Sequence, residues 1–582
     1  MSDLTAAQLI SMARQLLAAG DLAGAEGLAR RAIAMTANPP VSRDAWIVLA
    51  HIAQQRQDLA GAQAFWRKAA AIGAAAGVQE LLAAEIERLL RNAGDRPADP
   101  VAWFEAGKAL QEARDLDRAL ACYRRALELE PRYTAAMNNL GLALHDCGDT
   151  QPALDALSAA IDMPGGALSW DNYLYVLHFL DGVTTERIAA EHARWARSCA
   201  PPVTGTPAPF PNERDPHRRL RIGYVSPHFH RHPVGRMLIK LLASHEHASA
   251  EVICYSAGRR TDDITAALRL GADRWLNVHG NTDAALADQI RADRIDVLID
   301  LTMHMSGNRL GMFALRPAPV QITYLAYPST TGLPQMDYRV TDPLLDPPGS
   351  RPYPEKNLAL PDAYWCYAPP AEAPEINTLP ALCTNHVTFA SLNAFCKVSP
   401  RALAAWIRIL NQVPRSELVI HAYPGPHRAR VLGLFSAAGV APDRIRFFDR
   451  LPLKDYLTLH HQIDIALDPF AYAGGTTTLD AAFMGVPTIS LAGHAPHTRG
   501  GASILTALQL PELLATAQDP YIDAAVRLAS DLPRLSNLRQ TLRLRLTESV
   551  LCDAPRFARA FHAACRNAWQ NWCAAGIPSK PD

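Results

Sequence analysis

The segment DPFAYAGGTTTLDAAFMGVPTI carries the clearest chemistry in the sequence. A strand is predicted to end near Asp468, and Gly474 and Gly475 permit a tight backbone approach before three threonines open a helix. The first turn of a helix presents unpaired amides and the positive end of the helix dipole, and threonine hydroxyls add donors. This pattern fits a pyrophosphate bound without a metal ion, and it also fits an ordinary capped helix.

Two further polar clusters follow predicted strand ends. In FASLNAFCK, Lys397 could place a cation on the same phosphates, and a solvated lysine is the alternative. In SPHFHRHPVGRM, one loop carries His228, His230 and His232. A histidine there could serve as a general base near pH 7 or as a hydrogen-bond donor.

A metal ion is not expected among these groups. Alternating histidines without a nearby carboxylate match zinc sites poorly. From Asp215 onward the sequence has no Asp-x-Asp motif, a common arrangement for holding a divalent ion on a diphosphate. The helix terminus and a lysine would have to neutralise the diphosphate instead.

A third predicted strand end, in LIDLTMHMSGNRLG, offers Asp300 and His304. These side chains either orient a substrate or cap the turn that follows the strand. The two prolines of RPAPVQ, from Arg316 to Gln321, fix a sharp turn into the next strand. We interpret that segment as structural.

Short runs of β-branched and aromatic residues alternate with helical segments in the remainder of the chain. The predicted strands are LRIGYVS, EVICYSA, IDVLIDL and QITYLAYP in one half, and HVTFASLN, ELVIHAYP, RIRFFD, IDIALD and VPTISLAG in the other. This alternation predicts two parallel sheets with helices on both faces. We place the division between Leu379 and Asn385, with a ligand between the lobes at the carboxyl ends of the strands.

The first 160 residues carry a helical repeat. Segments that begin at Ala102 and Ala136 align with a period of 34 residues, which is the tetratricopeptide (TPR) period. Small residues recur where paired helices approach, at Gly107 and again at Gly141. Earlier copies, GDLAGAEGLARRAIAM and QDLAGAQAFWRKAAAI, are less regular, and an extra helix is expected around residues 81–92. Such arrays form a solenoid whose concave groove commonly holds an extended peptide.

Charge and cysteine content narrow the partners and the compartment. The sequence has 57 basic and 57 acidic residues, so no net field favours nucleic acid or an anionic membrane. Its ten cysteines form no Cys-x-x-Cys pair, and no run approaches the roughly 18 apolar residues of a spanning helix. We therefore expect a cytoplasmic protein with reduced cysteines.

Taken together, these motifs resemble the protein O-GlcNAc transferase family, which includes the SPINDLY-like O-fucosyltransferases. The similar stretches are RIGYVSPHFHRHPVGRM, FALRPAPVQITYLAYPSTTGLPQMDYRVTD, FASLNAFCKVSP and LDPFAYAGGTTTLDAAFMGVPTISLAG. The resemblance implies a bacterial member with an α-helical TPR solenoid, followed by a two-lobed α/β GT-B glycosyltransferase domain of two Rossmann-like lobes. The predicted domains are a TPR array at 1–163, a helical linker and proline-rich boundary at 164–217, an N-terminal catalytic lobe at 218–384, and a nucleotide-sugar-binding lobe with C-terminal helices at 385–582.

The resemblance also implies roles for individual residues. His232 matches a histidine beside sugar and acceptor that has been proposed as the catalytic base, and Lys397 matches the lysine that stabilises the departing diphosphate. The base is either such a side chain or a phosphate oxygen of the donor. The implied nucleotide-sugar contacts are Asn393, Lys397, Tyr456 against the nucleobase, Gly475, the phosphate-binding pair Thr476 and Thr477, Asp480 near the ribose, and Arg499. Asp300 and His304 are candidate contacts to acceptor or sugar.

Two donor sugars stay open at this point. The O-GlcNAc enzymes carry a histidine where this chain has Gly475, and the Thr-x-His around His304 is closer to the fucosyl branch. Arg499 matches the O-GlcNAc branch instead. We expect UDP-GlcNAc as the donor, with GDP-fucose as the alternative.

The sequence therefore predicts an inverting, metal-independent protein O-glycosyltransferase that needs no cofactor and moves N-acetylglucosamine to serine or threonine. The repeat groove would receive the acceptor protein, and the repeat surface is compatible with a homodimer. A TPR scaffold without catalytic activity is the alternative from another class.

Overall fold

The computed structural model describes residues 5–35, 39–56, 61, 65, 76–199, 209–349 and 353–575. The chain forms two compact units, Met1–Pro131 and Arg132–Asp582. The repeat copy predicted at 57–72 lies outside the described residues, apart from residues 61 and 65.

The first unit is entirely helical in its described part. Its helices are α1 (Ala6–Ala18), α2 (Leu22–Met35), α3 (Pro39–Gln55), α5 (Ala76–Asp95), α6 (Pro100–Glu112) and α7 (Leu116–Leu129). Asp99 and Asp115 cap α6 and α7 by accepting backbone N–H groups of the first turn. Helix α5 confirms the extra helix expected around residues 81–92 and extends it at both ends.

Close pairing of helices explains the small residues of the repeat. In the pair α6 and α7, a β-carbon added at Gly107 would come 2.8 Å from the ring of Tyr123. The second unit begins with the pair α8 (Thr134–Asp146) and α9 (Thr150–Ile161), and there a β-carbon at Gly141 would come 2.7 Å from Leu157. The same steric demand therefore recurs after 34 residues, which confirms the repeat.

Two helices lead from the repeat to the sheets. They are α10 (Trp170–Leu177) and α11 (Thr185–Cys199), and both lie in the helical linker predicted at 164–217. Most of the proline-rich boundary, residues 200–208, lies outside the described part of the chain.

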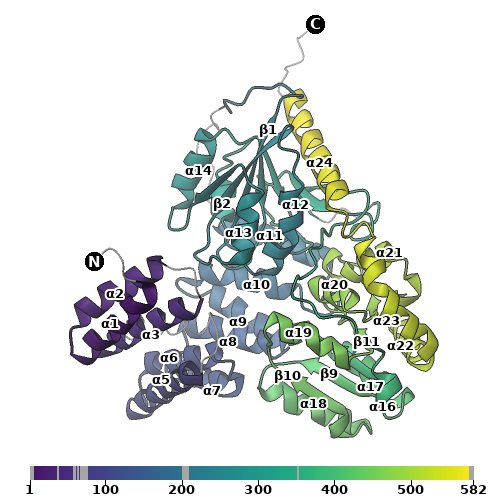
Figure 1. Cartoon of the computed structure of the whole chain (residues 1–582), viewed down its shortest axis with the longest axis horizontal. Helices are drawn as coiled ribbons and strands as arrows, with labels where there is room; N and C mark the ends of the chain where they lie inside the picture. Colours follow the sequence, from purple (N-terminus) through teal and green to yellow (C-terminus); the bar gives the residue numbers. More distant parts are fainter. Residues whose placement is uncertain are drawn as a thin grey trace. The chain divides into compact units, whose positions relative to one another are not determined.

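The first sheet has seven parallel strands in the order β3-β2-β1-β4-β5-β6-β7. The strands are β1 (Leu220–Ser226), β2 (Ala250–Ser256), β3 (Arg274–Asn277), β4 (Val297–Asp300), β5 (Val320–Thr323), β6 (Tyr338–Thr341) and β7 (Lys356–Ala359). The helices between them are α12 (Pro233–Ala243), α13 (Asp263–Leu270), α14 (Asp283–Ala292) and α15 (Leu310–Ala314). Figure 1 shows α12, α13 and α14 beside β1 and β2.

The second sheet has six parallel strands in the order β10-β9-β8-β11-β12-β13. The strands are β8 (Thr388–Ser391), β9 (Glu417–His421), β10 (Ile445–Phe448), β11 (Ile465–Leu467), β12 (Thr488–Leu491) and β13 (Leu514–Ala515). Its helices are α16 (Ala381–Thr384), α17 (Pro400–Gln412), α18 (Pro426–Ala437), α19 (Leu453–Leu459), α20 (Thr476–Phe483), α21 (Gly500–Ala507), α22 (Gln518–Ser530) and α23 (Leu532–Thr547). The predicted pair of Rossmann-like lobes is thus confirmed.

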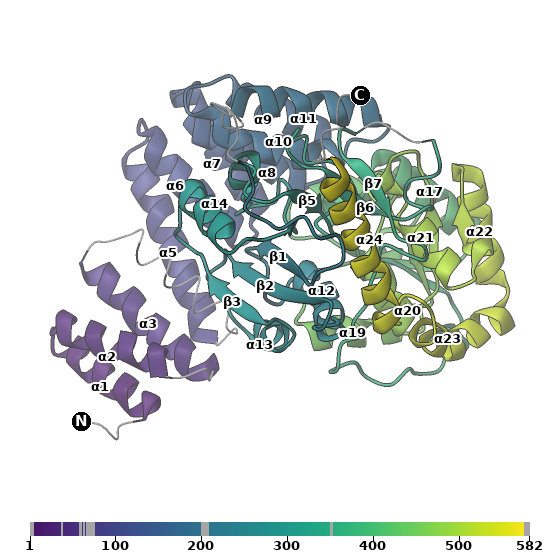
Figure 2. The same cartoon turned by 90° about the horizontal axis from the view of Figure 1, so that it is seen from above.

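The last described helix, α24 (Ala554–Ala575), returns to the first lobe. It contacts α12 and β5 of the first sheet, and Figures 1 and 2 show it in yellow alongside that sheet. The predicted range 385–582 places this helix with the second lobe, whereas its packing is on the first. One continuous buried core, which includes Leu220, Phe389 and Trp569, runs through both lobes.

Both sheets reverse their strand order at an equivalent point. In the first sheet the reversal lies between β1 and β4, and in the second between β8 and β11. Open parallel sheets bind ligands at the carboxyl ends of the strands that flank such a reversal. Most of the predicted site residues follow these four strands, at 228–232, 300–304, 393–397 and 468–477, whereas Tyr456, Asp480 and Arg499 lie outside these ranges.

Candidate functional site

In the loop between β11 and α20, polar side chains pack directly against the backbone of Gly474. The N–H of Gly474 donates to Oδ1 of Asp468 at 2.7 Å. A β-carbon on Gly474 would lie 2.5 Å from Oγ1 of Thr478 and 2.7 Å from that same carboxylate oxygen, so only glycine fits. Gly475 is the N-cap of α20, and the amides of Thr476–Thr478 form the first turn. Amides of a first turn have no helical carbonyl to bind, so they can bind an anion.

Asp468 organises the side chains around this turn. Its buried carboxylate accepts from Gly474, from Oγ of Ser490 at 2.7 Å and from Nδ2 of Asn393 at 3.4 Å. Burial raises the pKa of Asp468 to about 6. Asn393 in turn accepts a hydrogen bond from the hydroxyl of Thr477 at 2.9 Å. The predicted residues Asn393 and Thr477 are therefore in direct contact.

Lys397 lies at the same loop. Its Nζ donates to the carbonyl of Ala473 at 3.2 Å and stands 4.2 Å from the centroid of the Tyr472 ring. Burial lowers the pKa of Lys397, and the carboxylate of Asp468 partly opposes that shift. A cation is thus held just before the first turn of α20, as the sequence predicts.

Asp480 forms an ion pair with Arg236 that joins the two lobes. Arg236 of α12 donates to Oδ1 and Oδ2 of Asp480 at 2.7 and 3.1 Å, and the hydroxyl of Tyr367 donates to Oδ1 at 2.6 Å. The side chain of Asp480 is only 2% exposed. Burial raises the pKa of Tyr456, and the negative charge of the nearby Asp480 adds to that shift. Sequence reasoning missed Arg236 and Tyr367.

His232 begins α12 and caps it. Its Nδ1 accepts the backbone N–H of Val234 at 3.2 Å, and its ring stacks on His228 with centroids 4.1 Å apart. Burial lowers the pKa of His232 to about 3 and that of His228 to about 4, with further contributions from neighbouring charged groups. Both rings are therefore neutral at pH 7.

The cap decides which nitrogen of His232 carries the proton. Because Nδ1 accepts a hydrogen bond, the single proton of the neutral ring is on Nε2, which makes Nε2 a donor. A base with a pKa near 3 is also far from the value that suits proton abstraction at neutral pH. Of the two roles expected for a histidine here, the geometry favours the donor.

Asp300 and His304 are held by the protein itself. Asp300 accepts from the amides of Thr302 and Met303 at 3.1 and 2.9 Å, and from the hydroxyl of Thr323 at 2.9 Å. This carboxylate caps the turn in which Met303 takes a positive φ of 46°. His304 lies with Nδ1 2.7 Å from Oδ1 of Asp171 and Nε2 2.9 Å from the carbonyl of Thr331. The geometry favours the capping alternative for Asp300, and for His304 a structural position.

Arg499 ties the second lobe to the first. Its Nε donates to the carbonyl of Leu344 at 2.7 Å, and its Nη1 donates to the carbonyl of Gly493 at 2.8 Å. Burial lowers the pKa of the Arg499 guanidinium. These two contacts position the loop that precedes α21.

The described residues contain no group of three or more histidines, cysteines, aspartates or glutamates that could hold a metal ion. None of the ten cysteines, all of which lie in the described ranges, forms a disulfide. A membrane-spanning helix, judged by length and apolar character, is not found in the described ranges.

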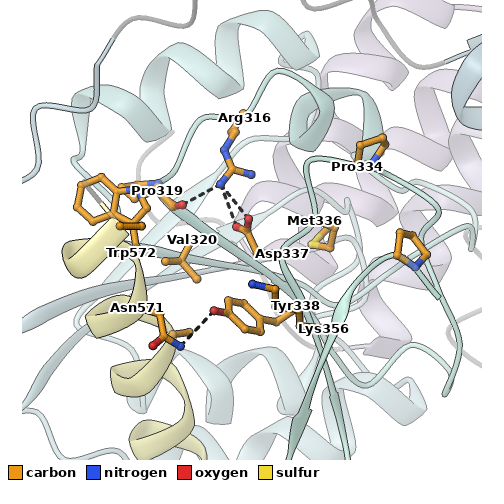
Figure 3. Close-up of a pocket in the computed structure, with 13 residues that line it drawn as sticks. Arg316, Pro319, Val320, Pro334, Met336, Asp337, Tyr338, Lys356, Asn571 and Trp572 are labelled. Carbon is orange, nitrogen blue, oxygen red and sulfur yellow. Dashed lines mark hydrogen bonds and ion pairs between the residues drawn. The ribbon is translucent and has the colours of Figure 1, made fainter. Parts of the chain in front are cut away.

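A cavity of about 330 Å³ lies at the opposite edge of the first sheet (Figure 3). It is lined by the first residues of β5, β6 and β7, and by α24. Arg316 donates to Asp337 at 2.9 Å and to the carbonyls of Pro319 and Gln335 at 3.1 and 2.7 Å. These bonds support the structural interpretation of the segment RPAPVQ. The cavity lies at the amino ends of the strands, away from the candidate site.

Comparisons with known proteins extend over most of the chain. The model of glycosyl transferase family 41 matches residues 171–367 and 377–561, and a tetratricopeptide repeat model matches residues 104–167. A mutant of the O-GlcNAc transferase from Thermobaculum terrenum, solved as a structure, is 32% identical with a TM-score of 0.80. That match covers 93% of this chain and 100% of the solved chain.

Two curated plant proteins are also similar, and both are named as probable UDP-N-acetylglucosamine–peptide N-acetylglucosaminyltransferase SPINDLY. The protein of Petunia hybrida is 38% identical over 63% of this chain and 40% of its own length. The protein of Solanum lycopersicum is 35% identical over 72% of this chain and 46% of its own length. The chain therefore spans less than half the length of these relatives.

Proposed function

Because the chain belongs to glycosyl transferase family 41, we propose that it is a protein O-glycosyltransferase. It transfers N-acetylglucosamine from UDP-GlcNAc to serine or threonine hydroxyls of acceptor proteins. The names of the similar proteins support this donor and this acceptor class. The observation that carries the proposal is the convergence of Lys397, Thr477 and the first turn of α20 at the strand-order reversal of the second sheet.

The reaction is a single displacement at the anomeric carbon. The acceptor oxygen forms a bond to that carbon while the bond to the diphosphate breaks, and the nucleoside diphosphate leaves with the electron pair. Attack from the opposite face inverts the configuration. Lys397 and the amides of Thr476 and Thr477 neutralise the charge that develops on the leaving diphosphate, which is why the proposal needs no metal ion.

His232 orients the reactants in this proposal. Its Nε2 proton can be donated to a sugar or acceptor oxygen, whereas its Nδ1 is occupied by the amide of Val234. The proton of the acceptor hydroxyl then passes to a phosphate oxygen of the donor. This assignment follows from the tautomer and the low pKa of His232.

The repeat supplies the acceptor site in the proposal. Paired helices such as α6 with α7 and α8 with α9 form the kind of array whose concave face holds extended peptides. The unpaired cysteines support a reducing compartment such as the cytoplasm. The homodimer expected from the sequence stays a prediction.

Nucleotide binding tests the proposal before any acceptor is known. A ligand that binds only the native state stabilises it by about 2.7 kcal/mol at a hundred times its dissociation constant. We expect UDP to raise the melting temperature and GDP to leave it unchanged. Stabilisation by GDP alone would favour the O-fucosyl alternative, and binding of neither nucleotide would favour the inactive scaffold.

A further inference from the structure

Trp365 lies against the N-cap of α20. A β-carbon placed on Gly475 would come 2.6 Å from Cη2 of Trp365, 3.1 Å from Cζ3 and 3.3 Å from Cζ2. These three atoms form the outer edge of the indole, and Gly475 precedes the first-turn threonines directly. The indole therefore occupies the space that any larger residue at position 475 would need.

The indole N–H of Trp365 is buried without a hydrogen-bond acceptor among the described residues. The residue is only 8% exposed. Nε1 belongs to the five-membered ring of the same indole, whose six-membered ring meets Gly475. Buried donors in native proteins are nearly always paired, and a phosphate oxygen of a bound nucleotide would be a suitable acceptor.

The backbone around Trp365 is fixed on both sides. The N–H of Tyr364 donates to Oδ2 of Asp342 at 2.8 Å, and the N–H of Tyr367 donates to the carbonyl of Leu551 at 2.8 Å. The ring of Tyr364 packs edge-on against the indole, with centroids 4.9 Å apart. The N–H is thus held in place before any ligand arrives, which lowers the entropic cost of using it.

We propose that Trp365 is a donor-binding residue whose indole N–H donates to the nucleoside diphosphate held at the first turn of α20. Gly475 is glycine because the ring needs its space. The inference rests on the proposed function, since it takes the nucleoside diphosphate of that reaction as its ligand. A hydrogen bond to a charged phosphate oxygen is among the stronger neutral-donor contacts.

Calorimetric titration with UDP and with GDP tests the proposal. Trp365→Phe removes the N–H and keeps an aromatic ring, and we expect it to weaken binding of the cognate nucleotide about 10- to 100-fold. The matched control is Trp572→Phe, on α24 at the far cavity, which should bind as the wild type does. Equal affinity of Trp365→Phe and the wild type would overturn the inference. A wild type that binds neither nucleotide would instead remove the proposed function.

The intact protein offers a second readout that a purely structural role of Trp365 would not move. In a spectrum of ¹⁵N-tryptophan-labelled protein, the indole signal of Trp365 is the one missing from the Trp365→Phe variant. We expect saturating UDP to move that signal downfield, as a new hydrogen bond does. An unmoved signal under saturation would contradict the proposal.

A double-mutant cycle tests the contact with Gly475. Gly475→Ala should weaken nucleotide binding because its methyl group displaces the indole. Phenylalanine lacks the outer edge of the indole, so Gly475→Ala should cost nothing further in a Trp365→Phe background. If the affinity losses of the two single variants multiply in the double variant, the two positions act independently.

Discussion

The first-lobe loops and the second-lobe loop carry similar polar residues, yet they use them differently. In the first lobe, His232 caps α12, Asp300 caps a turn, and His304 is held between Asp171 and Thr331. In the second lobe, no side chain among the described residues caps the first turn of α20. The hydroxyl of Thr478 likewise has no hydrogen-bond partner among them. Apart from Nε2 of His232, the first lobe thus uses these polar groups to fix shape, whereas the second lobe keeps donors for a ligand.

This difference separates two kinds of residue at one site. Changes in the second lobe should act mainly on nucleotide affinity and leaving-group stabilisation. Changes in the first lobe should act on the rate constant once the donor is bound. The predictions below test that division, beginning with the largest effect.

Replacing the cation of the second lobe should have the greatest effect. Lys397→Met keeps the length of the side chain but removes the charge beside the diphosphate, and we expect kcat/KM to fall about a thousandfold. The fold should survive, because the hydrogen bond that Nζ of Lys397 donates within the described part of the chain is to a loop carbonyl. Lys454→Met, an exposed lysine on α19, is the matched control and should retain full rates. Near-wild-type transfer by Lys397→Met would remove the leaving-group role.

His232→Asn separates capping from catalysis in the first lobe. Asparagine is a favoured N-cap that can still accept the N–H of Val234, but it lacks the Nε2 proton. We expect an unchanged melting temperature and UDP affinity, with kcat reduced about a hundredfold.

The pH profile of the same variant tests the tautomer. With a pKa near 3, His232 stays neutral above about pH 4, so the wild type should show no acid limb that belongs to it. A limb near pH 6 that both proteins share would belong to another group, such as Asp468. A limb near pH 6.5 that disappears only in His232→Asn would show that His232 titrates as a base.

The hydroxyl of Thr477 should contribute a smaller share of donor binding. Thr477→Val keeps the shape and removes the hydroxyl that donates to Asn393 at the first turn, so we expect about tenfold weaker UDP binding. Thr458→Val on α19 loses a comparable hydroxyl bond, to the carbonyl of Lys454, and is the control. Unchanged affinity in Thr477→Val would place the diphosphate elsewhere.

Acidic pH should lower the free energy of unfolding of the whole protein, and this effect separates the two lobes least. Burial lowers the pKa to about 4 for six histidines, which lie in the helices before the first sheet as well as in the lobes: His145, His178, His228, His427, His460 and His562. In the unfolded chain these groups have pKa values near 6.5, so below that pH the unfolded state binds more protons and the free energy of unfolding falls.

Three carboxyl groups oppose this trend. Burial raises the pKa of Asp300 and Asp468 to about 6 and also raises the pKa of Asp464, so at mildly acidic pH the native state binds protons that the unfolded chain does not. The six histidines outweigh the three carboxyl groups, each contributing about 1.4 kcal/mol per pH unit where the two states differ by a full proton. The melting temperature should therefore fall from pH 7 to pH 5. A melting temperature that rises over this interval would contradict the burial of these rings.

Most of the strands that sequence patterns identified are buried on both faces, such as β1 and β4, because they read as continuous apolar runs. The two edge strands of the first sheet, β3 and β7, were missed because their residues are largely exposed. Strand β6 was missed because it carries Arg339, which is buried in an ion pair with Asp346.

Within the site, local motifs predicted the loop groups and not their distant partners. Gly474, Thr477 and Lys397 follow β8 and β11, which are neighbours in the sheet, so the strand order brings them together. Arg236 meets Asp480 across 244 residues of sequence, and no local pattern records that pairing. The cluster AYWCY, which contains Trp365, is the one signal that could have drawn attention to the segment between the lobes.

Intact-mass spectrometry tests the central claim most directly. Acceptor proteins co-expressed with the chain should gain the mass of N-acetylhexosamine, and the gain should disappear when Lys397→Met replaces the wild type. A gain of deoxyhexose would contradict the donor assignment. No added sugar in any acceptor, with the wild type folded and UDP-GlcNAc present, would contradict the proposed activity itself.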